Sequence, residues 1–579
     1  MKRGELIVQM RWFWTQAQGC RFQAIINIFI GLVLVAVDFA FIYFSKQIID
    51  TAVESDDKSR LTSLAVCIVL LVLSQILLRV THRWLSSWLG VKAQNAMQEK
   101  LFRGVLGALW QGRERRHTGD VVNRLESDVS TIIGMAAERL PQVIVVIFRL
   151  IGAFVFLALM DWRLAVLVTF TLPFCILLSR VYFVRVRELT RSVRKTDSLI
   201  QSTMQELIQH QLVVKTLQQV DGAVGRLSAL HRRLHEQIMR RTRFNAYSMS
   251  MINVGFSGVY LISFLWGAFQ LQGHAITYGT MIAFVQLVAQ IQLPFREITQ
   301  FFPSLINAFT SIERLMELDM MPREADVMGG AEMLLIRGPI GLRFNDVSYC
   351  YNTSQRKILD NVSFTFPPGT FNAIVGETGV GKTTMIRLML SLIKPQSGSI
   401  EFYGEMGSLP VSMHTRSDIV YVPQGNTLLS GTIRENLMFG NPYACEEEMI
   451  EALKFAECDF VMDLPYGLDT VCGEMGLGLS EGQAQRIAIA RSMLHGGRIL
   501  LLDEVTSALD ANTEEAILAR LKTLTQAGKT IIFVTHRQEV IDCCDNIFRL
   551  IVRGRSVDDA VATVEDAGVG ETARNHHTD

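Results

Sequence analysis

Charged residues are scarce in this chain of 579 residues, and those present cancel. Only 19% of the residues are Asp, Glu, Lys or Arg, while 49% are hydrophobic and the mean hydropathy is +0.26. The formal net charge is zero, which gives no support to nucleic-acid binding, and we expect no nucleic-acid partner. So much apolar residue excludes disorder as the main state and, at this length, indicates membrane spans.

Cysteine is also scarce. The nine cysteines, an odd number, include no C-x-x-C pair. This excludes a disulfide framework and predicts free thiols in a reducing compartment.

Charged residues and long apolar runs are distributed unequally along the chain. Residues 1–320 contain 34 Lys and Arg and 22 Asp and Glu, a net charge of +12, whereas residues 321–579 carry the reverse, −12. Every apolar run long enough to cross a bilayer lies in the first of these parts. We therefore expect a transmembrane domain at 1–320, a linker at 321–340, a second domain at 341–555 and a mobile polar tail at 556–579.

Six segments have the length and composition of transmembrane helices. They are 22–44, 61–78, 140–160, 164–183, 247–271 and 281–302. The loops 79–139 and 179–246 carry ten and thirteen Lys and Arg, whereas the loops on the other side carry three, one and none. Positive residues concentrate in cytoplasmic loops. We therefore expect a multi-pass protein of the cell membrane (inner or plasma), with both termini and the second domain in the cytoplasm.

The long loops have a helical pattern. In 188–220, apolar residues recur at helical spacing without Pro or Gly, which predicts helices that continue into the cytosol. Within the spans, Asp38 and Arg149 are charged, and such residues usually face a bundle interior or a water-filled cavity. An ion-pair or cavity role and an ordinary helix contact both remain open for these two residues.

The sharpest chemical signal is AIVGETGVGKTT at 373–384. It satisfies the phosphate-loop pattern G-x-x-x-x-G-K-[ST]. The apolar run Phe371–Val375 predicts a strand before the loop, and Thr384–Ile393 predicts a helix after it. This is the context in which backbone N–H groups surround phosphates at the positive end of a helix.

In such a loop, Lys382 reaches the β and γ phosphates, and the Thr383 hydroxyl is placed for Mg²⁺. We expect ATP and Mg²⁺ as cofactors. The expected nucleotide contacts are Gly376, Glu377, Thr378, Gly379, Val380, Gly381, Lys382, Thr383 and Thr384.

A second apolar strand ends in two acids. RILLLDE at 498–504 predicts a buried strand that delivers Asp503 and Glu504. Beside a phosphate loop, Asp503 is expected at Mg²⁺, and Glu504 is a candidate general base for the attacking water. An ordinary pair of strand-end acids is the alternative.

The segment GLGLSEGQAQRIAIAR at 476–491 resembles the LSGGQ signature of ABC transporter ATPases, with Ser480, Gly482 and Gln483 at matching positions. Other motifs of that family follow in order. They are Tyr351 for the aromatic that stacks on adenine, Gln424 for the Q-loop at Mg²⁺ and the attacking water, Glu474 for the X-loop, Asp510 in the D-loop and His536 for the switch histidine. The resemblance implies that Glu504, His536 and Gln424 are catalytic.

The resemblance extends into the first half. The segments TGDVVNRLESDVSTI (118–132), QELIQHQLVVKTL (205–217) and PFREITQFFPSLINAFTSIERLMEL (294–318) are similar to the cytoplasmic loops and sixth span of exporter-type ABC half-transporters. The implied fold is a membrane α-helical domain of six transmembrane helices that extend into the cytosol, followed by an α/β P-loop ABC ATPase domain. The implied activity is ATP hydrolysis coupled to transmembrane transport.

Two residues depart from the family pattern. Glu481 replaces Gly as the third residue of the signature, and Val505 replaces Ala after Glu504. We expect activity to persist, with Glu481 able to tune its rate.

In this family, two ATPase domains close head to tail around two ATP molecules, so a single domain implies a dimer of chains. The complete motif set favours a homodimer, and a heterodimer remains open. The resemblance implies alternating-access export of an amphipathic, lipidic or drug-like substrate across the lipid bilayer. The alternatives are an importer with the exporter fold, for example for siderophore uptake, and an ATP-gated regulatory or channel-like membrane protein.

Overall fold

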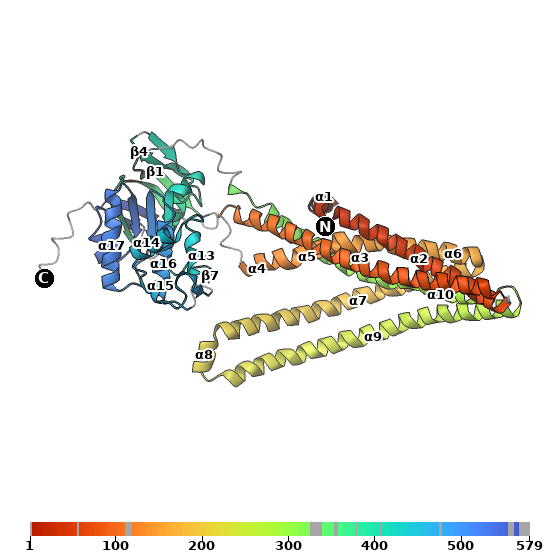
Figure 1. The fold of residues 1–579 in the computed structure, drawn as a ribbon. Helices are drawn as coiled ribbons and strands as arrows, with labels where there is room; N and C mark the ends of the chain where they lie inside the picture. The colour runs from red at the N-terminus through yellow and green to blue at the C-terminus, as the bar shows by residue number, and fades with distance from the viewer. Residues whose placement is uncertain are drawn as a thin grey trace. The chain divides into compact units, whose positions relative to one another are not determined.

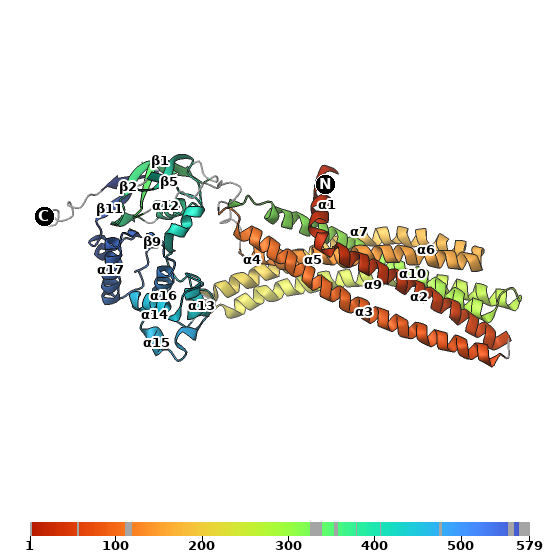
Figure 2. The same cartoon turned by 45° about the horizontal axis from the view of Figure 1, so that its top comes forward.

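The computed structural model describes residues 3–54, 57–110, 118–324, 338–351, 357–377, 379–405, 407–473, 478–553 and 561–566 (Figures 1 and 2). The chain divides into two compact units. The first contains Met1–Val105 and Thr118–Met320, and the second contains Leu106–His117 and Met321–Asp579. The division falls at the predicted residue 320, but loop 106–117 belongs with the second unit, whereas the sequence places it in the transmembrane domain.

The described part of the first unit consists of helices, some of them more than 40 residues long. They are α1 (Arg3–Gln16), α2 (Arg21–Glu54), α3 (Lys58–Leu106), α4 (Thr118–Asn123), α5 (Val129–Gly134), α6 (Leu140–Met160), α7 (Trp162–Gln209), α8 (Gln211–Thr216), α9 (Val220–Gln272) and α10 (Tyr278–Asp319). Two π-helical turns, η3 (Arg124–Asp128) and η4 (Met135–Arg139), join α4, α5 and α6 into one helical run.

Within the described residues, four helical segments are long and apolar enough to cross a membrane. They are Ile7–Val53, Lys58–Leu106, Thr118–Met160 and Val220–Gln272, and each contains one predicted span. The other predicted spans, 164–183 and 281–302, lie in α7 and α10. Many of their side chains are outside the described residues.

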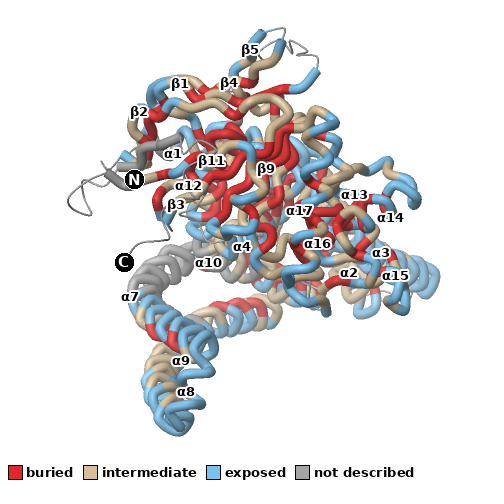
Figure 3. Tube along the Cα trace, turned by 90° about the vertical axis from the view of Figure 1, so that its left-hand side faces the viewer, coloured by how far each residue is buried: buried red, intermediate tan, exposed pale blue. Residues whose placement is uncertain are grey.

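The helices predicted for the second long loop are present. Helices α7 and α9 pack along each other, and the short α8 joins their ends (Figure 1). Apolar side chains at this tip are exposed, among them Ile208, Leu212 (76%) and Leu217, and Figure 3 shows α8 largely in the exposed colour. The tip therefore carries an apolar surface that its own unit does not cover.

Three helices of the first unit meet at Asp38, on α2. Arg149 Nη2 of α6 lies 3.4 Å from Asp38 Oδ2, and Arg79 Nη2 of α3 lies 3.6 Å from Oδ1. Gln75 Nε2 donates to Oδ1 at 3.1 Å. Of the roles left open for Asp38 and Arg149, the structure shows an ion pair, which supplies the partners that a charge in a spanning helix requires.

A second ionic cluster joins two of the segments that resemble the ABC family. Ser311 Oγ of α10 donates to the buried Asp128 at 2.8 Å, and Arg314 lies 3.3 Å from the same carboxylate. Arg124 pairs with Glu317 at 2.8 Å. Segment 118–132 is thus fastened to the end of α10, just before the linker.

The second unit is built on a ten-stranded sheet in the order β5-β4-β1-β2-β12-β11-β3-β10-β9-β6. The strands are β1 (Gly341–Cys350), β2 (Lys357–Phe366), β3 (Phe371–Gly376), β4 (Ser397–Gly404), β5 (Gly407–Pro410), β6 (Ile419–Val422), β9 (Ile499–Asp503), β10 (Thr530–Val534), β11 (Asn546–Arg553) and β12 (Val561–Asp566). Strands β7 (Gly431–Thr432) and β8 (Val471–Cys472) form a separate pair.

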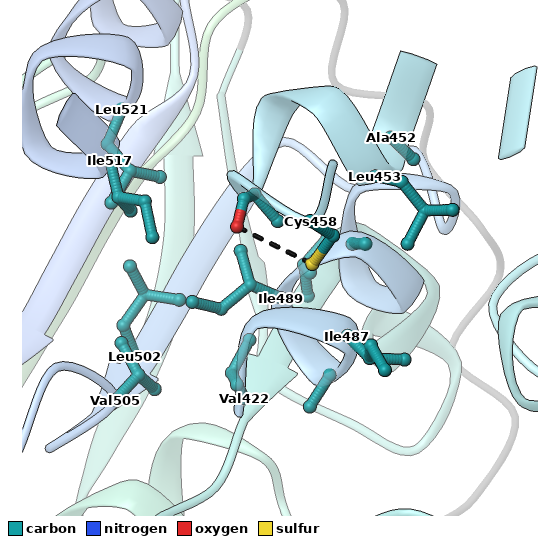
Figure 4. Close-up of a cluster of buried hydrophobic side chains, with 14 of the residues drawn as sticks. Val422, Ala452, Leu453, Cys458, Ile487, Ile489, Leu502, Val505, Ile517 and Leu521 are labelled. Atoms are coloured by element: carbon teal, nitrogen blue, oxygen red, sulfur yellow. Dashed lines mark hydrogen bonds between the residues drawn. The ribbon is translucent and has the colours of Figure 1, made fainter. Parts of the chain in front are cut away.

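Helices cover both faces of the parallel part of this sheet. They are α12 (Lys382–Met389), α13 (Ile433–Met438), α14 (Glu446–Phe455), α15 (Phe460–Asp463), α16 (Glu481–Met493), α17 (Ala511–Gln526) and α18 (Gln538–Ile541). In β9, Leu500 and Leu502 face the core with α14, α16 and α17, part of which is drawn in Figure 4. Ile499 and Leu501 face the other core, with α12. This alternation is the ordinary period of a strand buried on both faces.

Loop 106–110 is attached to the start of the linker. Leu109 N donates to Pro322 O at 2.9 Å, and Glu324 N donates to Gly107 O at 3.0 Å. Glu324 is in turn paired with Arg416 at 2.7 Å, and Trp110 packs against the core that contains α12. These contacts explain why the loop segment belongs with the second unit.

The mobile tail expected at 556–579 is wrong for Val561–Asp566. These residues form β12, which pairs antiparallel with Phe548–Arg553 of β11. The sequence VATVED contains β-branched residues that suit a strand, and the strand lies between β11 and β2 in the sheet. The remaining tail residues lie outside the described part.

Candidate nucleotide site

The predicted site residues are gathered by the order of the parallel strands. Strands β3, β10, β9 and β6 are neighbours and run parallel. Their carboxyl ends therefore lie at one edge of the sheet, where ligands bind in open α/β folds. The phosphate loop follows β3, His536 follows β10, and Gln424 follows β6. Asp503 ends β9, and Glu504 comes directly after it.

The phosphate loop has the backbone that its glycines predict. Gly379 and Gly381 have backbone φ values of +85° and +113°, which residues other than glycine rarely adopt. Lys382 Nζ donates to Gly376 O at 2.8 Å, folding the lysine back over the loop. Strand β3 ends one residue after the predicted end at Val375. Helix α12 begins at Lys382 and ends at Met389, whereas the sequence predicts a helix from Thr384 to Ile393. Thr378 lies outside the described residues.

Glu504 is the point where the predicted catalytic residues meet. Gln424 Nε2 donates to Glu504 Oε2 at 2.7 Å, and His536 Nδ1 lies 3.4 Å from Oε1. Lys382 Nζ lies 3.7 Å from the same Oε1. The Glu504 side chain is only 16% exposed, so these neighbours supply most of its polar surroundings.

The backbone of Glu504 is unusual. Its φ is +48°, in the left-handed region that a residue with a Cβ seldom occupies. Its N–H donates to Val534 O at 2.9 Å, which ties the turn after β9 to β10. Such conformations persist where the surrounding structure enforces them, and they cluster at active sites.

Asp503 precedes Glu504 at the end of β9. Burial, followed by the neighbouring negative charge of Glu504, raises the pKa of Asp503 to about 6, although Lys382 and a hydrogen bond from Tyr421 oppose the shift. Tyr421 is a site residue that the sequence reasoning missed. Its place in YVPQ gave a signal, because strand alternation puts it on the α12 face.

Tyr351 lies against α12. Its hydroxyl accepts a hydrogen bond from Arg387 Nη1 at 2.8 Å and is 3.4 Å from Thr384 Oγ1. The sequence reasoning also missed Arg387, which anchors this aromatic ring beside the helix that begins in the phosphate loop.

The signature residues form a helix start. Ser480 is the N-cap of α16, where its Oγ accepts from Gln483 N at 3.2 Å and Gln483 Oε1 accepts from Ser480 N at 2.9 Å. A Cβ at Gly482 would lie 2.7 Å from Ala508 O, so only glycine fits beside the turn that leads to Asp510. Glu474 and Gly476 lie outside the described residues.

Asp510 is itself a cap. Its Oδ2 accepts from Thr513 N at 3.0 Å at the start of α17, and this bond lowers the Asp510 pKa. Among the described residues, no hydrogen bond or ion pair connects Ser480, Gln483 or Asp510 with the phosphate loop of the same chain.

Two family models match the chain. That of the ABC transporter transmembrane region matches residues 24–295, and that of the ABC transporter itself matches residues 359–507. The chain belongs to the ABC transporters. Its membrane domain and its ATPase domain are fused in one polypeptide, as in an exporter-type half-transporter.

Relatives of this ABC transporter match most of its length. A putative multidrug export ATP-binding/permease protein of Staphylococcus aureus is 29% identical over 500 residues, which are 86% of each chain. A serine protease/ABC transporter B family protein of Dictyostelium discoideum is 28% identical over 90% of this chain, which spans 30% of that relative. The solved structure of a bacterial Atm1-family ABC exporter with ATP bound shares the fold, with a TM-score of 0.75, 22% identity and coverage of 92% of this chain and 93% of that one.

The ATPase domain of this transporter should become more stable when Asp503 loses its charge. A rise in pKa from 3.8 to about 6 means that ionisation costs the folded state free energy, and Asp503→Asn removes that cost. In protein free of nucleotide and Mg²⁺, we expect Asp503→Asn to raise the free energy of unfolding by about 1–3 kcal/mol above pH 7. The gain should shrink as the pH falls through 6, because the wild-type carboxyl then becomes neutral.

Thermal unfolding at pH 5 and pH 8 measures this effect. Asp418→Asn is a control in the same domain, because Asp418 pairs with Arg498 at 2.9 Å and its loss should lower stability or leave it unchanged. A destabilised Asp503→Asn protein at pH 8 would contradict the prediction.

Proposed function

We propose that this chain forms a homodimer that hydrolyses ATP to export a small amphipathic, lipidic or drug-like molecule across a cell membrane. The observation that carries the proposal is the convergence of Lys382, Gln424 and His536 on the Glu504 carboxylate within one chain. Two copies of a chain with this set would have two equivalent ATP sites. The multidrug-export name of the staphylococcal relative supports the direction and the class of substrate.

Each residue of the site has its own role in ATP hydrolysis. Glu504 is the base that accepts a proton from the attacking water, and Gln424 orients its carboxylate. Lys382 and the loop N–H groups hold the β and γ phosphates, and His536 contacts the γ phosphate. The carboxylate beside Lys382 gives this lysine a nearby counter-charge until phosphates take its place.

The acids and hydroxyls of the site fit Mg²⁺. Thr383, Gln424 and Asp503 would hold the ion together with the phosphates, and the bound ion would neutralise the charge that develops on them. The raised pKa of Asp503 beside Glu504 marks two acids that a cation would stabilise. Among the described residues, no group of three His, Cys, Asp or Glu side chains could hold a metal alone, so the ion depends on the nucleotide.

The second copy would complete each site. Within the part of the chain that the structure describes, the signature residues have no polar bond to the phosphate loop of their own chain, and Ser480 is exposed at the start of α16. A partner could therefore place its phosphate loop against Ser480 and the free end of α16, whose N–H groups attract phosphate. The exposed apolar tip at α8 offers a further surface for the partner. Closure around ATP would then shift the membrane domains between inward-facing and outward-facing states.

The test is transport by the purified chain alone. Reconstituted into vesicles with the ATPase domain outside, the chain should hydrolyse ATP and accumulate amphipathic dyes or lipids in the lumen, and it should migrate as a dimer. Activity only in the presence of a different half-transporter would replace the homodimer with a heterodimer. ATP-driven loss of substrate from the lumen would show import, and ATP-gated flux without accumulation would show a channel.

A further inference from the structure

The position of His536 depends on its neighbours in the chain. Its side chain is 63% exposed, so packing does little to fix the imidazole. The residues on either side of it are anchored. Thr535 is buried, and its N–H donates to Ile374 O at 3.1 Å. Arg537 follows His536, and its N–H donates to Thr535 Oγ1 at 3.0 Å.

The Arg537 guanidinium joins the loop of His536 to the segment that follows β9. Its Nη1 donates to Thr506 O at 2.9 Å, and its Nη2 lies 2.7 Å from Glu514 Oε2. Thr506 lies in the turn after β9, and Glu514 lies in the first turn of α17. One planar group with several donors therefore fastens the loop at two points.

The pair formed by Glu514 and Arg537 is largely withdrawn from water. The Glu514 side chain is only 3% exposed and that of Arg537 is 26% exposed. Among the described residues, Glu514 Oε1 has no hydrogen-bond partner, so the acid relies on the arginine. Burying two charges is costly, and apolar residues in such places are often as stable or more stable. Stability alone gives no reason for this pair, whereas the fixed geometry of a guanidinium between two acceptors does.

The same loop places His536 beside the candidate base. His536 Nδ1 lies 3.4 Å from Glu504 Oε1, so two consecutive residues contact Glu504 and the turn that follows it. Because the imidazole is largely exposed, this distance depends on where the backbone of the loop is held. A displacement of about 1 Å at a reacting group can cost a factor of about 100 in rate.

We propose that Arg537 is a positioning residue, whose guanidinium, fixed by Glu514 and Thr506 O, holds His536 beside Glu504 for its contact with the γ phosphate. The inference rests on the proposed contact of His536 with that phosphate. Arg537 itself need not touch the nucleotide. Its loss should therefore lower the rate of the chemical step and leave the affinity for ATP nearly unchanged.

The alternative is a structural role, in which the ion pair only joins the end of β10 to α17. That role predicts a loss of stability when the pair is removed, but no change in kcat per folded molecule. It also predicts the same effect whether or not His536 is present. The experiment therefore compares kcat at equal folded fraction, with and without the imidazole.

The test variant replaces both members of the pair with apolar residues, Glu514→Leu together with Arg537→Met, so that no buried charge is left without a partner. Glu539→Gln is the matched control, because Glu539 is an exposed acid 3.8 Å from Nε of the same arginine and exposed pairs contribute little. The purified full-length chain in nanodiscs gives kcat and KM for ATP with Mg²⁺. Single-turnover hydrolysis covers the slow variants, and the binding stoichiometry of a non-hydrolysable fluorescent ATP analogue gives the folded fraction.

We expect the apolar pair to lower kcat by about 10–100-fold, with KM within about threefold of wild type and Glu539→Gln like wild type. His536→Ala should lower kcat by about 100–1,000-fold, and adding the apolar pair to it should cause no further loss. Arg537→Lys keeps the charge but loses the planar fork, so it should lower kcat in the same way and by a smaller factor.

Wild-type kcat in the apolar-pair variant overturns the inference. If that variant does not fold, Arg537→Lys decides, and wild-type kcat in it overturns the inference equally. The same fold-loss in the presence and in the absence of His536 overturns it as well, because the pair would then act on another part of the site. If His536→Ala hydrolyses ATP at the wild-type rate, the proposed role of His536 fails, and the inference fails with it.

Discussion

Replacing Glu504 with Gln should lower steady-state ATP hydrolysis by a factor of about 10²–10⁴, the usual contribution of a general base. The variant should still bind ATP, because Lys382 keeps its bond to Gly376 O and the loop backbone is unaltered. A glutamine at 504 can still accept from Gln424, so the local geometry should persist. What it loses is the capacity to take a proton from water.

The measurement combines turnover with nucleotide binding. Phosphate release from purified protein gives the rate, and titration with a fluorescent ATP analogue gives the affinity, expected to be within about threefold of wild type. Glu446→Gln is the matched control, since Glu446 is an exposed acid of the same domain that pairs with Arg434 at 3.0 Å. Turnover of Glu504→Gln within about tenfold of wild type would exclude Glu504 as the base.

The parts of the site that could be predicted are those encoded by short-range patterns. The loop 376–384 could be recognised because the turn, its glycines and Lys382 are contiguous. Glu504 and Asp503 could be recognised because an apolar strand precedes them. In each case one stretch of sequence contains both the element and the chemistry, so no tertiary contact is needed to recognise it.

What escaped prediction depends on pairings between distant segments. Tyr421 packs on the α12 face beside Leu501 because β6 lies beside β9, and strand order is not readable from either strand alone. The attachment of loop 106–110 to the linker likewise depends on Leu109 meeting Pro322. Strand β12 forms because it pairs with β11 on one side and β2 on the other, and its own residues do not reveal these pairings.

The end of α12 shows a third limit. The apolar pattern continues through Ile393, and Leu390 and Ile393 are indeed buried. The helix nevertheless stops at Met389, because Ser391 adopts a φ of +50°, which no helix accommodates. Buried residues therefore continue beyond the end of the helix, and hydrophobic periodicity indicates which residues are buried but not where the helix ends.

A charge placed at Ser480 should abolish hydrolysis without disturbing the chain that carries it. Aspartate is as good an N-cap as serine, so Ser480→Asp should preserve the start of α16 and its bond from Gln483 N. In a head-to-tail dimer the new carboxylate would face the γ phosphate bound by the partner. We expect hydrolysis to fall at least about 100-fold, because like charges at close range oppose binding of the transition state.

The matched control is Ser480→Asn, which caps the helix equally well and carries no charge. It should retain clearly more activity than Ser480→Asp. Near-equal losses in the two variants would show that the hydroxyl, rather than the charge, decides the effect.

Mixing two inactive chains gives the decisive form of this test. Lys382→Ala should bind phosphate poorly at its own loop, and Ser480→Asp should fail to complete the loop of its partner, so either homodimer should be inactive. In the mixed dimer, the intact loop of the Ser480→Asp chain meets the intact Ser480 of the Lys382→Ala chain. This pairing forms one complete site, so co-expressed and co-purified chains should regain hydrolysis. If hydrolysis instead requires both residues in the same chain, the mixture will stay inactive, and the head-to-tail dimer must be abandoned.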